Sequence, residues 1–183
     1  MTNFTKTIKP FKLIFIGGVH GTGKGRFCNQ LCSELKWEHL VASELLRWTE
    51  YSDDIANKKV KSISETQVRL MQGLNRKCVE GGSYLLDGHY TLLDNEYRVT
   101  RIDSKIFRAI NPSVLLLKTE VLDTVWRRLK ARDRRTYPIS LIDRMLDEEY
   151  AYSLELAAVL GVPHIEIGSN NYREAISKIA QLL

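Results

Sequence analysis

The chain has 183 residues, of which 44% are hydrophobic and 27% are charged. It is long enough for one substantial core and too short for two ordinary domains, so we expect a single domain over residues 1–183. Apolar runs such as Leu13–Ile16 and Val114–Leu117 fall far below the roughly 20 residues of a membrane-spanning helix, which excludes a bilayer span. The net charge of +5 is typical of a protein that binds an anion, whether nucleotide, phosphorylated metabolite or nucleic acid.

The N-terminal segment and the cysteines indicate a reducing, cytoplasmic location. Residues 1–12 lack the apolar stretch and the small-residue cleavage site of a secretory signal. Cys28, Cys32 and Cys78 are an odd number of cysteines, which is typical of reduced core thiols. Cys28 and Cys32 are one helical turn apart, but neither a second cysteine pair nor a histidine cluster in the sequence completes a metal site, so we predict no metal there.

The first elements are a strand, a helix and a second short strand. Lys12–Ile16 is a β-branched and aromatic run that ends at two glycines, which favours a buried strand. Arg26–Leu35 carries apolar residues at helical spacing. A short apolar piece at His39–Ala42 precedes Ser43, whose hydroxyl can cap the next helix. Asp53–Lys61 is polar and predicts a loop.

The middle of the chain continues the alternation. Apolar residues recur at helical spacing over Ser64–Cys78, and a glycine pair follows that helix. Ser83–Leu86 is the next strand and closes on Asp87. Ile102–Ile110 predicts a short helix, which an Asn-Pro pair ends.

The last part of the chain completes a pattern typical of a parallel sheet. Val114–Leu117 is a strong strand, and Leu122–Arg132 and Ile139–Leu160 are two long helical patterns. His164–Ile167 predicts the last strand and Tyr172–Leu183 the last amphipathic helix. Strands that alternate with helices over the whole length indicate an α/β fold with helices on both faces of the sheet.

A glycine-rich segment between the first strand and the first helix predicts a phosphate-binding loop. Gly18–Lys24 has the spacing G-x-x-x-x-G-K of a P-loop, or Walker A motif. In such a loop backbone N–H groups converge on phosphate oxygens, the helix N-terminus adds partial positive charge, and the lysine reaches the outer phosphates. We therefore predict binding of ATP, with GTP as the alternative, through Gly18, His20, Gly21, Thr22, Gly23, Lys24, Gly25 and Arg26.

Gly25 departs from the motif at the position of the magnesium ligand. A serine or threonine usually follows the lysine and coordinates Mg²⁺ through its hydroxyl. Water, Thr22 or Asp87 can compensate, because Mg²⁺ keeps several waters in such sites. We expect Mg²⁺ as cofactor, held by Asp87 through water.

The order of motifs from Lys12 onward resembles adenylate kinase and the related nucleoside monophosphate kinases. This resemblance implies a three-layer P-loop fold with a five-stranded parallel sheet in the order 2-3-1-4-5. It also implies an acceptor-binding region at about residues 43–80 and a short lid at about residues 127–138. The segment Ser43–Arg47 is similar to the G-D-L-L-R segment of these kinases, so Ser43 and Arg47 are expected to bind the acceptor. A solvated arginine on a capped helix is the alternative for Arg47.

Asp87-Gly88-His89 is similar to the D-G segment at the same place in these kinases. The resemblance implies that Asp87 binds magnesium or orients the acceptor, and that Gly88 allows the acceptor to approach the backbone. His89 replaces the family's continuation to a second acceptor-binding arginine, which argues against a nucleoside monophosphate acceptor. His89 is expected to contact the acceptor, either as a general base for a hydroxyl or as a packed loop histidine.

A basic run at Trp126–Arg135 lies where the resembled kinases have their lid. Lid arginines clamp the transferring phosphoryl group and neutralise its charge, and this implies catalytic roles for Arg128 and Arg132. A solvated basic helix and a nucleic-acid surface are the alternatives. Gly168–Asn171, after the last strand, is expected to hold the nucleotide base or to form an ordinary turn.

Together these features predict an ATP-dependent kinase that acts on a small nucleotide or nucleoside-like acceptor, with Lys24, Asp87, Arg128 and Arg132 as catalytic residues. A nucleotide-binding sensor with weak catalysis is the alternative, because Gly25 and the missing arginine both weaken the kinase pattern. A nucleic-acid 5′-end kinase is the third reading, and it requires salt-sensitive oligonucleotide binding through Arg127–Arg135.

Overall fold

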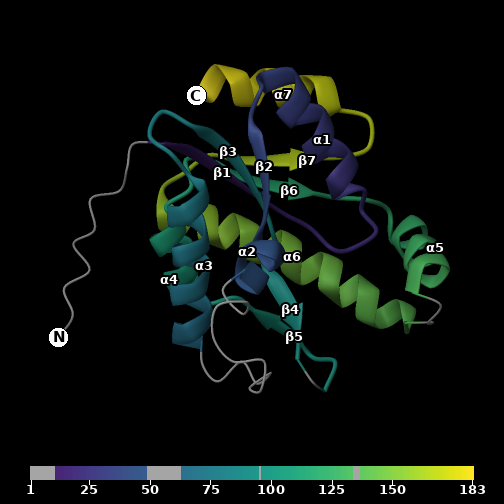
Figure 1. Cartoon of the computed structure of the whole chain (residues 1–183). Coiled ribbons are helices and arrows are strands. Elements are labelled where there is room, and N and C mark those ends of the chain that lie inside the picture. The colour runs from purple at the N-terminus through teal and green to yellow at the C-terminus, as the bar shows by residue number, and fades with distance from the viewer. Residues whose placement is uncertain (1–10, 49–62, 95, 134–136) are drawn as a thin grey trace.

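The computed structural model describes residues 11–48, 63–94, 96–133 and 137–183, with side chains at all of these positions except 47–48 and 63–67. Five strands in these ranges form one parallel sheet (Figure 1). From edge to edge they are β2 (Glu38–Val41), β3 (Ser83–Asp87), β1 (Lys12–Gly17), β6 (Leu115–Lys118) and β7 (His164–Ile167). This order is 2-3-1-4-5 when the strands of the sheet are numbered among themselves, so the expected fold is confirmed.

Helices cover both faces of this sheet (Figure 1). One face packs against α1 and α7, and the opposite face packs against α3, α4 and α6. Near β2, α2 packs against α3, and α5 packs against α6 beside the loop that follows β1. The helices are α1 (Lys24–Leu35), α2 (Ala42–Trp48), α3 (Ile63–Lys77), α4 (Ser104–Ile110), α5 (Leu122–Asp133), α6 (Ile139–Leu160) and α7 (Tyr172–Leu182).

The central strand β1 shows why its sequence is apolar throughout. Successive side chains of a strand point to opposite faces. Leu13 and Phe15 enter the core on the side of α3, α4 and α6, whereas Ile14 and Ile16 enter the core on the side of α1 and α7. Because both faces are buried, the run does not alternate with polar residues.

A small antiparallel hairpin was not expected from the sequence. It pairs β4 (Thr91–Leu93) with β5 (Val99–Arg101) and follows directly after β3. The buried Glu149 of α6 accepts hydrogen bonds at its Oε1 from the Tyr90 and Thr91 backbone amides, at 2.9 and 2.7 Å, and from the Thr91 hydroxyl. This carboxyl group fixes the start of the hairpin and the end of the Asp87-Gly88-His89 segment.

The expected N-cap at Ser43 is wrong, several helix and strand ends differ from expectation by one or two residues, and one expected loop lies outside the described residues. Helix α2 begins at Ala42, so Ser43 lies within its first turn rather than at the N-cap. Helix α5, which was expected to end at Arg132, ends one residue later, at Asp133. The loop expected at Asp53–Lys61 is outside the described residues.

Across the described part of the chain, no helix combines the length and the apolar character that a membrane crossing requires.

Gly17, at the end of β1, is required by the packing of Tyr90. A Cβ atom on Gly17 would lie 2.3 Å from two carbons of the Tyr90 ring. That ring is fully buried, and its hydroxyl donates a hydrogen bond to the Leu116 carbonyl at 2.9 Å, so it has little freedom to move away. The first strand therefore enters the loop against an aromatic ring that tolerates only glycine.

We expect Gly17→Ala to lower the free energy of unfolding by about 3 kcal/mol, the upper end of overpacking penalties. Urea unfolding of the nucleotide-free protein measures this change. Gly25→Ala is the matched control, because no atom lies within 4 Å of its added Cβ. In the first turn of α1 that change should stabilise the fold by up to about 1 kcal/mol. Equal stability of the two variants would contradict the packing role of Tyr90.

Candidate functional site

The segment between β1 and α1 has the backbone of a phosphate-binding loop. Gly18, Gly21 and Gly23 have φ angles of 139°, 89° and 87°, values that residues with a Cβ rarely adopt. At Gly18 there is also no space, because an added Cβ would lie 2.6 Å from the Lys118 carbonyl oxygen. Gly23 is the N-cap of α1, and no described side chain caps this helix end. The first amides of α1 thus remain available to an anion.

A cavity of about 1820 Å³ opens beside this loop. We call the part of the cavity around residues 19–26 the loop end. The cavity is also lined by Glu120, Arg128, Arg132 and residues 169–174. All of the P-loop residues expected to hold the phosphates line the cavity except Gly18, which lies beneath the loop against β6. The apolar end, defined by its large hydrophobic side chains, is lined by Phe15, Leu46, Leu70, Ile106, Phe107 and Ile110.

Lys24 connects the loop to the end of β3. Its ammonium group lies 2.8 Å from Oδ1 of Asp87 and donates a hydrogen bond to the Gly88 carbonyl. The lysine side chain is only 9% exposed and the aspartate side chain 15%, so the pair is largely shielded from water. The predicted phosphate-binding lysine and the predicted acceptor-side carboxylate are therefore in direct contact.

Asp87 occupies the carboxyl end of β3, where the strand register brings it opposite Ile16 of β1. Burial alone would raise the pKa of the Asp87 carboxyl, but the neighbouring His39 ring and the Lys24 ammonium outweigh it. The pKa of Asp87 therefore lies below its ordinary value, and the group is a carboxylate at neutral pH.

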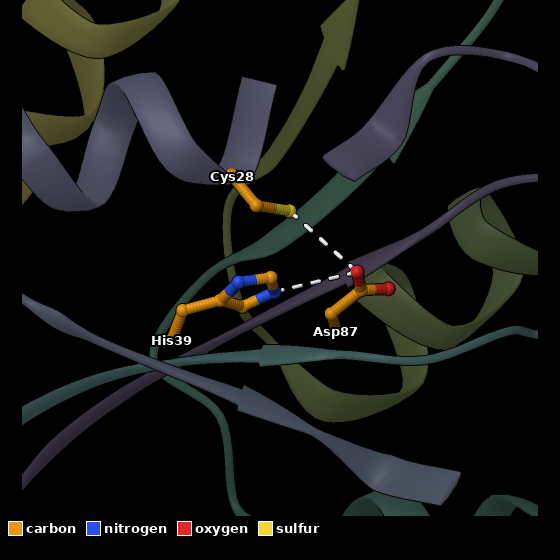
Figure 2. A group of neighbouring side chains, drawn as sticks. All are labelled: Cys28, His39 and Asp87. Carbon is orange, nitrogen blue, oxygen red and sulfur yellow. Dashed lines mark hydrogen bonds and ion pairs between the residues drawn. The ribbon is translucent and has the colours of Figure 1, made fainter. Parts of the chain in front are cut away.

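Two further side chains approach the second oxygen of Asp87 (Figure 2). Nε2 of His39, from β2, lies 3.4 Å from Oδ2, and Sγ of Cys28, from α1, lies 3.8 Å from the same atom. Burial and the nearby Asp87 carboxylate raise the pKa of the Cys28 thiol, so this cysteine is protonated at neutral pH. Sequence reasoning placed Cys28 with Cys32 and missed its contact with Asp87, which is 59 residues away.

His89 lies over the loop rather than at the apolar end of the cavity. Its ring packs against His20, with ring centroids 4.3 Å apart, and bonds to the backbone of Gly18. Burial, with help from Lys24 and His20, lowers the pKa of His89 to about 3. Such a low pKa makes His89 an inefficient general base near neutral pH, because proton transfer works best when the pKa is close to the working pH. The geometry favours a packed loop histidine.

The loop offers few direct ligands for magnesium. Thr22 is buried, and its hydroxyl donates to the Val19 carbonyl at 2.8 Å, so the expected compensation by Thr22 is not available in this arrangement. Gly25 has open space around it but no side chain. Asp87 is the carboxylate closest to the loop lysine, and a magnesium ion that keeps its water shell fits such a site.

The two predicted lid arginines lie on α5 and line the cavity. Arg128 donates to the Gly21 carbonyl at 2.9 Å and lies 3.3 Å from Oε2 of Glu120. Arg132 is held by Asp133 through two hydrogen bonds. Arg127 points elsewhere, because it pairs with Asp123 and does not line the cavity. The basic run thus divides into residues that face the loop and residues that do not.

The structure brings some of the expected acceptor-side residues to the cavity. Ser43 lines the cavity, but the side chain of Arg47 lies outside the described residues, as do Arg134 and Arg135. Ser169 and Asn170 line the loop end, and Ser169 donates to Glu120 at 2.6 Å. Sequence reasoning also missed Glu120, which lines the loop end, and Glu149, which anchors the segment after β3, because their positions depend on strand ends and helix packing rather than on a motif.

Comparison with known proteins agrees with this geometry. A model of the AAA domain family matches residues 17–143, more than half of the chain. Human adenylate kinase isoenzyme 5 is 27% identical over 165 residues, which are 86% of this chain and 29% of that protein. The Bos taurus protein of the same name is 26% identical over 139 residues, 74% of this chain and 25% of its own length. This chain therefore spans less than a third of these relatives.

A solved structure confirms the fold. Shikimate kinase from Acinetobacter baumannii, in complex with shikimate, superimposes with a TM-score of 0.59 and 15% sequence identity. The match covers 95% of this chain and 93% of that chain. The P-loop fold inferred from the glycine-rich loop and the strand order is thus supported by an independent structure.

We expect Asp87→Asn to lower the free energy of unfolding by about 3 to 5 kcal/mol, because it leaves the Lys24 ammonium buried without a counter-charge. The double variant Lys24→Met, Asp87→Asn should be more stable than Asp87→Asn alone, since it removes that charge too. Urea unfolding of the four proteins of this double-mutant cycle, without nucleotide, measures the coupling. Simple addition of the two single effects would show that the pair contributes no interaction energy.

Proposed function

The chain belongs to the AAA domain family, and from this premise we propose that it is an ATP-dependent phosphotransferase whose acceptor is a small molecule with a hydroxyl group. The observation that carries the proposal is the contact between Lys24 and Asp87 at 2.8 Å, where the loop end of the cavity meets its apolar end. A phosphate-binding cation and an acceptor-side carboxylate are thus within reach of the same transferring group.

Each residue of the site has a role in this transfer. The loop amides and Lys24 would hold the outer phosphates of the nucleotide, as oriented donors and a mobile cation do in other P-loops. Asp87 would accept the hydrogen bond of the acceptor hydroxyl and direct its oxygen toward the terminal phosphorus. Arg128 and Arg132 would neutralise the charge of the transferring group and of the departing phosphate.

Magnesium would supply charge neutralisation between the outer phosphates. Asp87 is the residue that would hold its water shell, because Gly25 has no hydroxyl and Thr22 is turned toward Val19. A water-mediated site of this kind is compatible with the octahedral coordination of Mg²⁺. We expect weaker magnesium binding than in a loop with serine or threonine at this position.

The apolar end of the cavity points to the chemistry of the acceptor. Its large side chains come from β1, α2, α3 and α4 and include two phenylalanines, Phe15 and Phe107. Arg101 lines this region too, but its guanidinium is already paired with Glu148 and Glu155. An uncharged ring or hydrocarbon with one hydroxyl group suits this lining better than a nucleoside monophosphate does.

Two other functions remain as candidates with specific support. A nucleotide sensor is favoured by Gly25 and by the contact of Lys24 with Asp87 and Gly88, which nucleotide phosphates must compete with. A nucleic-acid 5′-end kinase has less support, because Arg127 is already paired with Asp123, and Arg128 and Arg132 line the cavity.

The deciding experiment measures consumption of Mg·ATP with a panel of nucleosides, nucleoside monophosphates, aromatic and alicyclic alcohols and 5′-hydroxyl oligonucleotides. We expect turnover that depends on an alcohol or nucleoside, with a drop of at least about 10²-fold in Lys24→Ala and in Asp87→Ala. Arg127→Ala is the matched control and should retain wild-type rates. Tight, Lys24-dependent nucleotide binding without turnover on any acceptor would favour the sensor.

Gly25→Ser tests the magnesium interpretation separately. The added side chain meets no atom within 4 Å of its Cβ, and its hydroxyl would supply the ligand that the motif normally has. We expect the Mg²⁺ concentration for half-maximal turnover to fall by roughly tenfold, as a polar contact of about 1.4 kcal/mol would give. Gly25→Ala controls for the change in helix propensity, and an equal effect of both variants would contradict a coordinating role.

A further inference from the structure

Three potential metal ligands from three separate elements lie close together (Figure 2). Sγ of Cys28 from α1, Nε2 of His39 from β2 and a carboxylate oxygen of Asp87 from β3 all lie within 4.8 Å of one another. A thiol, an imidazole and a carboxylate are the three side-chain types that bind zinc in proteins. Their convergence was not foreseen, because the sequence offered Cys28 only a partner one helical turn away.

Two of the distances between these ligand atoms are close to the spacing around one small ion. Bonds of about 2.3 Å to sulfur and about 2.0 Å to nitrogen and oxygen, at tetrahedral angles, separate neighbouring ligands by roughly 3.3 to 3.6 Å. The sulfur to oxygen distance here is 3.8 Å and the nitrogen to oxygen distance is 3.4 Å. The sulfur and the nitrogen lie within 4.8 Å of each other, so side-chain rotations that shorten this distance by up to about 1.3 Å would bring Cys28 and His39 onto an ion beside Asp87.

His39 provides independent support for a ligand at this position. Its Nε2 atom is shielded from solvent and has no hydrogen-bond partner of ordinary geometry among the described residues. Its contact with Oδ2 of Asp87, at 3.4 Å, is long for a hydrogen bond, so this buried nitrogen is only weakly satisfied. The nitrogen is directed at Asp87, as Figure 2 shows, so a cation between the two would satisfy both.

We propose that Cys28, His39 and Asp87 form a three-ligand site for a borderline-soft divalent transition-metal ion of the Zn²⁺ class. The thiol proton of Cys28 passes to the solvent when the thiolate binds the ion, and the neutral imidazole and the carboxylate complete the protein ligands. Asp87 lines the cavity, so a water molecule from the cavity takes the fourth position. The two negative ligands balance the charge of the ion, which offsets the proximity of the Lys24 ammonium.

Magnesium is not the ion for this site. Mg²⁺ prefers oxygen ligands in octahedral geometry and loses its water reluctantly, whereas thiolate and imidazole select softer ions. The zinc-class site shares only Asp87 with the proposed kinase site, and its occupation requires neither nucleotide nor acceptor. Failure of one proposal is therefore distinguishable from failure of the other.

The test is titration of the chelator-treated full chain with Co²⁺, in the absence of nucleotide and with millimolar Mg²⁺ present. We expect one equivalent to bind, with a thiolate-to-cobalt charge-transfer band and the strong visible bands of four-coordinate cobalt, and Zn²⁺ should abolish both. Cys28→Ala should remove the charge-transfer band and weaken binding by more than about 100-fold, while His39→Gln should weaken it by at least about tenfold.

Cys32→Ala and Cys78→Ala are the matched controls, because neither thiol belongs to the cluster, and both variants should bind cobalt as the unmodified chain does. His39 is partly exposed, so His39→Gln preserves the fold even where a change at the buried Cys28 does not. Circular dichroism of each variant checks this. The proposal is overturned if cobalt does not bind stoichiometrically, if Cys32→Ala removes the charge-transfer band, or if His39→Gln binds with unchanged affinity. In that case Cys28 and His39 only orient Asp87.

Discussion

The hydrogen-bonded register between β1 and β3 places the two halves of the site side by side. Asp87 is opposite Ile16, and the amide of Gly88 donates to the Ile16 carbonyl at 2.9 Å, just before the chain turns into the glycine-rich loop. Because the strands are parallel, both carboxyl ends reach the same edge of the sheet. A register shift of one residue would turn Asp87 toward the opposite face and separate it from Lys24. The loop, the acceptor side and the candidate metal site all depend on this pairing.

This register is held rigid by burial on both faces and by one buried carboxyl group. Leu86 and Phe15 pack under α3, α4 and α6, and Leu85 and Ile16 pack under α1 and α7, so neither strand can slide without exposing apolar surface. Glu149 then anchors the chain that leaves β3. Burial raises the pKa of Glu149, and the hydrogen bonds from Thr91 and Tyr90, together with the positive charge of Lys24, offset part of this effect. The site is thus supported by a layer of packing that has no catalytic chemistry of its own.

The sequence alone was sufficient for the parts of the molecule that depend on local pattern. The apolar runs predicted all five strands of the main sheet, and the spacing of glycines around Lys24 predicted a loop with three positive φ angles. The hairpin was missed because Thr91–Leu93 and Val99–Arg101 are short and mix polar with apolar residues. The turning of Thr22 toward Val19 is a property of the folded loop. His39 and Cys28 meet Asp87 only through strand order and helix packing, which no residue spacing encodes.

The position of Lys24 has a thermodynamic consequence for the order of events at the site. Its ammonium contacts the Asp87 carboxylate and donates to the Gly88 carbonyl. Phosphate oxygens that draw this charge toward the loop would loosen its contact with the carboxylate and change the field at the apolar end of the cavity. Occupants of the two ends would then be linked, and each would alter the affinity of the other by the same factor. Lys24 would then couple the binding of nucleotide to the binding of the acceptor, in addition to holding the phosphates.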